Sequence, residues 1–173
     1  MNVMIDLETM GTDPNSAIIA IGAVSFDEHG VYGEDYNVVD LADSVSEGLV
    51  INPATVLWWM KQSDEARAEF SSDYAMPLRQ ALEFFSAFFH RVGGKELWGN
   101  GSDFDNVILA NAYRTVGKKA PWGFWNNRCY RTMKNVYCDI EMERGGTHHN
   151  ALDDAKSQAT HLIAIAQYHG LTL

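Results

Sequence analysis

Residues 2–27 read NVMIDLETMGTDPNSAIIAIGAVSFD and hold two apolar runs, 2–7 and 17–26, joined by a short polar linker. The second run is rich in β-branched residues and closes on the turn sequence DEHG at 27–30. Residues 31–39 alternate loosely between apolar and polar side chains, as a third strand would. These residues therefore predict an antiparallel meander of three strands.

The sequence changes to helix-like patterns after residue 52. Pro53 suits the first position of a helix, and Ser63 suits the cap of another short one. From about residue 76, apolar residues recur at three- and four-residue steps, which predicts a longer helix that stops at the two glycines 93–94.

Strand and helix signals alternate in the second half of the chain. A short strand is expected at 96–99, and Ser102 lies three residues before Asp105, the spacing of a capping box for a helix to about residue 116. Residues 126–137 carry mixed signals for a strand and for a helix. An apolar face predicts a last helix that ends before Gly170. This order indicates an α/β protein, with a mixed sheet flanked by helices.

The composition fits an ordinary globular domain. At 173 residues, with 46% hydrophobic and 21% charged residues, a single domain spanning 1–173 is expected. No apolar run is long enough to cross a bilayer and no secretory signal is visible, so a cytoplasmic location without membrane contact is expected. Cys129 and Cys138 form neither a disulfide framework nor a zinc pattern and are expected to be free thiols.

The net charge of −10 at first argues against a nucleic-acid partner. Residues 106–138, however, contain no acidic side chain. Their basic residues are Arg114, Lys118, Lys119, Arg128, Arg131 and Lys134. Six aromatic residues lie in the same segment, and such rings can stack on unpaired bases while cations contact phosphates. The alternative is a solvated loop whose aromatic residues turn into the core.

Two acidic clusters lie near the expected ends of elements. Alternation along a strand puts Asp6 and Glu8 on one face, where two ionised carboxylates need a compensating cation. Asp105 shares a helical face with apolar residues at the +3, +4 and +7 positions, so it is expected to point toward the core. Asp103 is better interpreted as a turn or capping carboxylate.

A third cluster, HHNALDD at 148–154, enters the last helix. Its doubled His and doubled Asp leave the register open from spacing alone. Asp154 borders the apolar face of the helix, which weakly favours it over Asp153. A structural role for either His148 or His149 is equally compatible with the spacing.

Together the three clusters resemble the signatures of the DEDDh 3′-5′ exonucleases. The first signature matches Asp6, Glu8, Thr9 and Gly11; the second matches Asn100, Phe104, Asp105 and Leu109, with one extra residue after the Asn; the third matches His149, Ala151, Leu152 and Asp154. This resemblance selects His149 and Asp154 within the doubled pairs. Residues 52–67 also resemble the phage and bacterial RNase T-like exoribonucleases, some relatives of which are named exodeoxyribonucleases.

The resemblance implies a ribonuclease H-like fold with a five-stranded mixed sheet whose first three strands are antiparallel. It implies hydrolysis with two divalent ions, Mg²⁺ or Mn²⁺, held by Asp6, Glu8, Asp105 and Asp154. His149 would accept a proton from the attacking water, because an imidazole pKa of about 6.5 suits that task. The expected substrate-binding residues are Thr9, Met10, Gly11, Trp58, Asn100, Phe104, Arg114, Arg128 and Arg131.

The expected partner is the 3′ end of a single-stranded nucleic acid or a 3′ overhang, with RNA slightly favoured over DNA, and the expected assembly is a homodimer. Four alternatives stay open: an exodeoxyribonuclease, an endonuclease with a similar carboxylate set, a catalytically silent nucleic-acid-binding module, and an unrelated α/β protein whose acidic residues are solvated.

Overall fold

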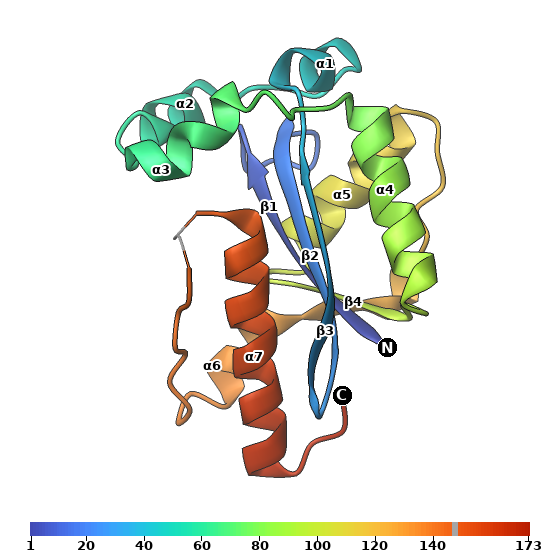
Figure 1. The fold of residues 1–173 in the computed structure, drawn as a ribbon, viewed down its shortest axis with the longest axis vertical. Helices are drawn as coiled ribbons and strands as arrows, with labels where there is room; N and C mark the ends of the chain where they lie inside the picture. The colour runs from blue at the N-terminus through green and yellow to red at the C-terminus, as the bar shows by residue number, and fades with distance from the viewer. Residues whose placement is uncertain (147–148) are drawn as a thin grey trace.

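The computed structural model describes residues 1–146 and 149–173, without the side chains of Glu69 and Ser71. The strands form one five-stranded sheet in the order β3-β2-β1-β4-β5 (Figure 1). Their bounds are β1 Asn2–Thr9, β2 Ile18–Asp27, β3 Gly30–Val38, β4 Glu96–Gly99 and β5 Asn127–Cys129. β1, β2 and β3 pair antiparallel, whereas β4 and β5 join parallel to β1. The predicted mixed sheet with three antiparallel leading strands is confirmed.

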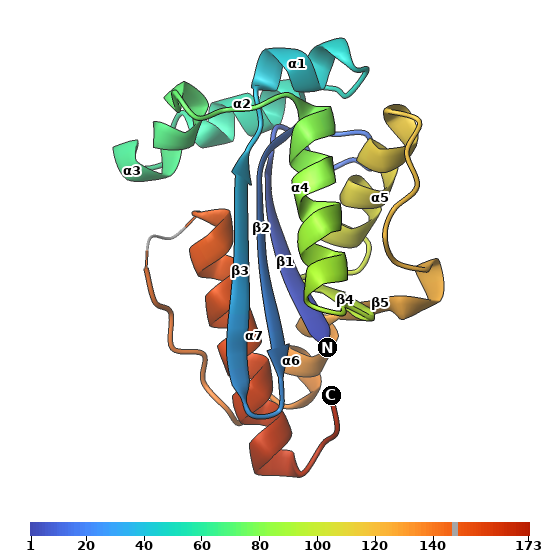
Figure 2. The same cartoon turned by 45° about the vertical axis from the view of Figure 1, so that its right-hand side comes forward.

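Helices cover both faces of the sheet. α7 lies on one face and α4 with α5 on the other, while the short helices α1 to α3 gather at one end (Figure 2). The longer helices are α4 Leu78–Arg91, α5 Asp105–Thr115 and α7 Ala151–His169. The short ones are α1 Leu41–Ser46, α2 Pro53–Trp59, α3 Asp64–Arg67, η1 Ala68–Ser71, η2 Phe124–Asn126 and α6 Tyr130–Val136.

Alternation along β1 divides its side chains between two cores. Val3, Ile5 and Leu7 join the core beneath α4 and α5, whereas Met4 joins the core beneath α7. Because side chains two residues apart share a face, Asp6 and Glu8 follow Met4 toward α7. The strand thus carries its carboxylates to the face where the last helix begins.

Gly22 of β2 lets α7 approach the sheet beside this point. It is the antiparallel partner of Asp6. A Cβ atom at Gly22 would lie 2.2 Å from the carbonyl carbon of Ala151, at the start of α7. Only a residue without a side chain leaves room for the helix to begin there.

Several local predictions have definite outcomes. Residues 126–137 form parts of η2, β5, α6 and the C-cap at Tyr137, which explains their mixed strand and helix signals. The short helix α1 is an element that the sequence did not predict. Ser63 caps α3, as expected. The capping box from Ser102 is wrong, because α5 has Phe104 as its N-cap without a side-chain cap bond. Among the described residues, no helix is both long and apolar enough to cross a membrane.

Candidate active site

An open cleft of about 560 Å³ lies between the end of β1, α2 and the start of α7. Four of the five residues predicted to be catalytic line it: Asp6, Glu8, His149 and Asp154. The fifth, Asp105, is buried behind them, with its side chain against the backbone of β1. The fold therefore brings together residues from three separate parts of the sequence.

The first strand supplies Asp6 and Glu8. Glu8 is buried, and Asp6 is partly exposed to the cleft. Gln158 of α7 donates a hydrogen bond from Nε2 to Asp6 Oδ1 at 2.7 Å. The other oxygen of this amide, Oε1, is buried without a hydrogen-bond partner among the described residues. The amide therefore orients Asp6 and leaves an acceptor atom close to the carboxylates.

Asp105 is held by backbone groups at the first turn of α5. Its Oδ1 accepts the N–H of Leu7 at 3.2 Å and its Oδ2 accepts the N–H of Asn100 at 2.9 Å. Burial raises its pKa to about 7, although both backbone hydrogen bonds and the charge of Arg131 act in the opposite direction. Asp103 is exposed, which agrees with the choice of Asp105 from helical phase.

The start of α7 supplies His149 and Asp154. Asn150 caps the helix, and its side-chain oxygen accepts the N–H groups of Leu152 and Asp153. His149 lies just before this cap with φ of 64°, and its backbone N–H donates to Asp154 Oδ2 at 3.0 Å. A left-handed backbone is uncommon for His and is often found at functional sites. The alternative residue His148 lies outside the described residues.

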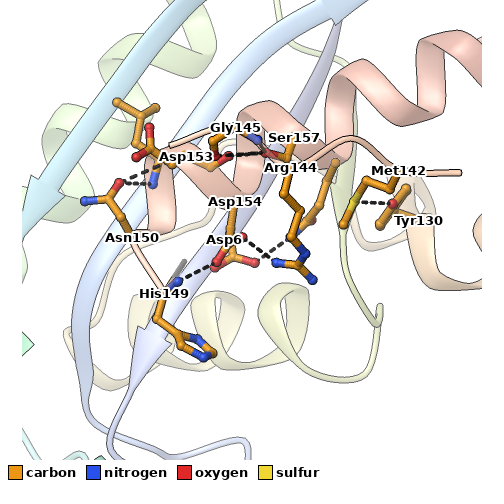
Figure 3. Close-up of polar contacts among 12 residues, drawn as sticks. Asp6, Tyr130, Met142, Arg144, Gly145, His149, Asn150, Asp153, Asp154 and Ser157 are labelled. Carbon is orange, nitrogen blue, oxygen red and sulfur yellow. Dashed lines mark hydrogen bonds and ion pairs between the residues drawn. The ribbon is translucent and has the colours of Figure 1, made fainter. Parts of the chain in front are cut away.

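The carboxylates repel one another. Figure 3 shows Asp6 and Asp154 together, with Arg144 at their edge. Burial is the largest cause that raises the pKa of Asp6 well above its ordinary value, followed by the charges of Asp105 and Asp154. Gln158 and Arg144 lower this pKa and offset only part of the effect. A bound cation would relieve the repulsion between the carboxylates and would favour their ionised forms.

The donor atoms also fit a metal ion. One ligand atom from each of Glu8, His149 and Asp154 lies within 4.8 Å of the others. Asp6 is close enough to Asp154 for their charges to interact. Carboxylate oxygens are the ligands that Mg²⁺ and Mn²⁺ prefer. The residues present therefore fit a divalent metal site.

The predicted substrate-binding residues divide into two groups. Five of them line the cleft: Thr9, Gly11, Trp58, Asn100 and Phe104. α2 is fixed over the cleft because Trp59 donates a hydrogen bond from Nε1 to the carbonyl of Thr9 at 2.9 Å. Trp58 is 42% exposed, and its ring centroid lies 4.9 Å from that of His149. Trp58 is therefore available to a ligand in the cleft.

The other four residues lie outside the cleft lining. Met10 is buried in the core beneath α4 and α5, and Arg114 is exposed on α5. Arg128 pairs with Glu96 at 2.7 Å, and Arg131 donates to the carbonyl of Asn100. Their predicted contacts with substrate stay predictions.

Sequence reasoning missed Arg144 and Gln158 as cleft residues. Gln158 lies four residues after Asp154, one helical turn along the same face, and this spacing could have indicated it. Arg144 lies in the segment before α7, outside any helix or strand, where no periodicity exists to indicate its direction.

A family described as the 3′-5′ exoribonuclease Rv2179c-like domain matches residues 1–166. The chain belongs to this family. The Rv2179c-like match identifies it as a 3′-5′ exonuclease, a hydrolase acting on nucleic acids. DEDDh exonucleases use divalent metals, and the donor atoms of Glu8, His149 and Asp154 form a possible metal site in this chain.

This Rv2179c-like chain is similar to several known nucleases. An exodeoxyribonuclease of Enterobacteria phage T4 is 26% identical over 160 residues, which cover 75% of this chain and 68% of the phage protein. The nuclease domain of 3′hExo, a DEDDh family member bound to rAMP, aligns with a TM-score of 0.68 and 15% identity, covering 99% of this chain and 94% of that domain. Exonuclease I aligns with a TM-score of 0.61 and 16% identity over 96% of this chain, which spans only 41% of that longer protein. These two structural matches support the fold.

Proposed function

We propose that this protein removes nucleotides from the 3′ end of single-stranded RNA by hydrolysis with two divalent ions, Mg²⁺ or Mn²⁺. The observation that carries the proposal is the convergence of Asp6, Glu8, Asp154 and His149 on one open cleft, with Asp105 behind them. The chain from 1 to 173 acts as one domain in this proposal, and its location is cytoplasmic.

The carboxylates of Asp6, Glu8, Asp105 and Asp154 hold the ions. Bound there, the ions supply positive charge that stabilises the attacking and leaving oxygens of the phosphodiester. Their charge also makes an acidic cleft attractive to phosphate, which answers the objection raised by the net charge of −10. His149 accepts the proton of the attacking water. Trp58, Phe104 and Asn100 contact the terminal nucleotide from the cleft walls.

RNA is the favoured polymer because the matching family is described as an exoribonuclease family. DNA is the second candidate, since the phage T4 relative carries the name exodeoxyribonuclease. Discrimination between the two depends on contacts with the 2′-hydroxyl group. A silent binding module would not need to keep all five predicted catalytic residues in one arrangement.

The deciding experiment measures the degradation of single strands of RNA and DNA with the same sequence. The strands are labelled at the 5′ end, and the reactions contain Mg²⁺, Mn²⁺ or EDTA. The expected result is a ladder of RNA products shortened stepwise from the 3′ end, and no products in EDTA. Shortening of DNA alone would establish the second candidate. Cleavage of circular strands would indicate an endonuclease, and full activity in EDTA would contradict the metal mechanism.

A homodimer is part of the proposal because of the resemblance to RNase T-like enzymes. Phe124 and Trp125 are 80% and 69% exposed beside the basic residues of 106–138, and a second copy or a bound strand would cover them. Sedimentation velocity with and without a single-stranded oligonucleotide tests this assembly. A monomer at all concentrations would contradict it.

A further inference from the structure

Arg144 is the one arginine or lysine among the described residues that line the cleft. Its Nη1 lies 3.0 Å from Asp154 Oδ1, and half of its side chain is exposed (Figure 3). The basic residues predicted to contact phosphates, Arg114, Arg128 and Arg131, lie outside this lining. Apart from bound metal ions, Arg144 is therefore the positive charge positioned to meet a phosphate in the cleft.

The segment that carries Arg144 is attached to the fold on both sides of this residue. Before it, Tyr130 Oη lies 3.2 Å from the sulfur of Met142. After it, the backbone N–H of Gly145 donates to Ser157 Oγ of α7 at 3.2 Å. These contacts fix the backbone near α7, so the guanidinium is held at the edge of the carboxylate cluster.

Arg144 contacts an oxygen of Asp154 that a bound metal ion would need. Asp154 Oδ2 already accepts the backbone N–H of His149, and Arg144 contacts the other oxygen, Oδ1. A guanidinium binds carboxylates and phosphates with the same planar arrangement of N–H groups. Arg144 can therefore exchange one partner for the other with a small movement of a half-exposed side chain.

We propose that Arg144 pairs with Asp154 in the metal-free enzyme and moves to a non-bridging oxygen of the 3′-terminal phosphodiester when Asp154 ligates a divalent ion. This proposal rests on the proposed function, because it assigns Arg144 to the phosphate of that substrate. Arg144 is then a substrate-binding residue that also competes with metal for Asp154.

The test compares Arg144→Gln and Arg144→Lys with the wild-type protein in two titrations followed by calorimetry, neither of which requires turnover. In the first, Mn²⁺ alone is the probe. Arg144→Gln should bind Mn²⁺ about 2- to 5-fold more tightly, because it lacks the competing exposed ion pair. In the second, AMP is added at saturating Mn²⁺, and its 5′-phosphate stands for the phosphate that a 3′-5′ exonuclease releases. Arg144→Gln should bind AMP at least about 10-fold more weakly, and Arg144→Lys should fall between it and wild type.

Arg91→Gln is the matched control, because Arg91 ends α4 on the other face of the sheet and packs over Phe88. It should bind Mn²⁺ and AMP as wild type does. Unchanged AMP affinity in Arg144→Gln overturns the proposal, and so does weaker Mn²⁺ binding, which would mean that Arg144 only orders Asp154. An inactive wild-type enzyme on both RNA and DNA would instead overturn the proposed function, so the two failures are distinguishable.

Discussion

Gln158 of the last helix donates a 2.7 Å hydrogen bond to Asp6 of the first strand, a residue 152 positions earlier in the chain. This bond fixes the direction of a carboxylate proposed to ligate metal. Groups that orient metal ligands typically contribute about 10- to 100-fold to activity or metal affinity. Gln158→Met, which keeps the side-chain length, should therefore lower nuclease activity by about that factor.

The control for Gln158 is Gln167→Met on the same helix, whose amide donates to the carbonyl of Glu28 at an exposed position. Activity and melting temperature measured together separate orientation of Asp6 from loss of folding. Equal activities for the two variants would contradict the orienting role.

His149→Asn tests the proton acceptor without disturbing its unusual backbone. His149 has φ of 64°, and Asn tolerates this conformation better than most residues. Loss of general-base catalysis should reduce the rate by about 10²- to 10⁴-fold. Mn²⁺ affinity measured by calorimetry should change little, because in the proposed function the carboxylates of Asp6, Glu8, Asp105 and Asp154 hold the ions and His149 does not. His148→Asn is the companion variant, and a larger rate loss at His148 would transfer the role to that residue.

Trp58→Ala tests stacking on the terminal base. Trp58 is 42% exposed in the cleft, beside the ring of His149. Loss of a base-stacking contact should raise the KM for single strands by about 5- to 100-fold. Leu57→Ala is the control, because Leu57 is 61% exposed on the same helix and lies outside the cleft lining. Steady-state kinetics on an end-labelled oligonucleotide measure both, and equal KM values would exclude the stacking contact.

The raised pKa of Asp105 predicts a pH-dependent stability in the absence of metal. The folded protein keeps a proton on this carboxyl up to about pH 7, whereas an unfolded Asp releases it near pH 3.9. The stabilisation from this group is thus complete below about pH 4 and is lost as the pH rises toward about 7. Asp105→Asn should therefore reduce the change in the free energy of unfolding between these pH values by up to about 1.4 kcal/mol per pH unit.

Urea unfolding in EDTA at a series of pH values measures the slope. The change of slope is the readout rather than absolute stability, because Asn cannot accept both backbone N–H groups that Asp105 accepts. Asp103→Asn, at an exposed neighbouring position, should keep the wild-type slope. If Asp105→Asn kept the wild-type dependence of stability on pH, the attribution of that dependence to Asp105 would be contradicted.

Gly22→Ala tests the close approach of α7 to the sheet. The added Cβ would lie 2.2 to 2.4 Å from backbone atoms of Ala151 and Leu152, which cannot move without shifting the start of α7. Overpacking of this kind costs about 1–3 kcal/mol or more. The melting temperature should fall, and activity should fall further because His149 and Asp154 move with the helix. Gly30→Ala, where a Cβ meets nothing within 4 Å, should have little effect.

The sequence by itself determined the longer elements and the placement of several carboxylates. Strand alternation placed Asp6 and Glu8 on one face, and helical phase separated Asp105 from Asp103. These inferences succeeded because both periodicities follow from local backbone geometry, which acts over a few residues. The choice of His149 and Asp154 needed the resemblance, since spacing alone did not distinguish the doubled residues.

Only the tertiary structure decided which charges surround the site. The capping box failed because the carboxylate of Asp105 is used by the N–H groups of Leu7, 98 positions away, and Asn100. The basic segment 106–138 was expected to contact phosphate. Among the described residues, however, the arginine or lysine that lines the cleft is Arg144. The reason is physical: the path of an irregular segment and the pairing of its side chains depend on contacts between residues distant in sequence, which no local pattern encodes.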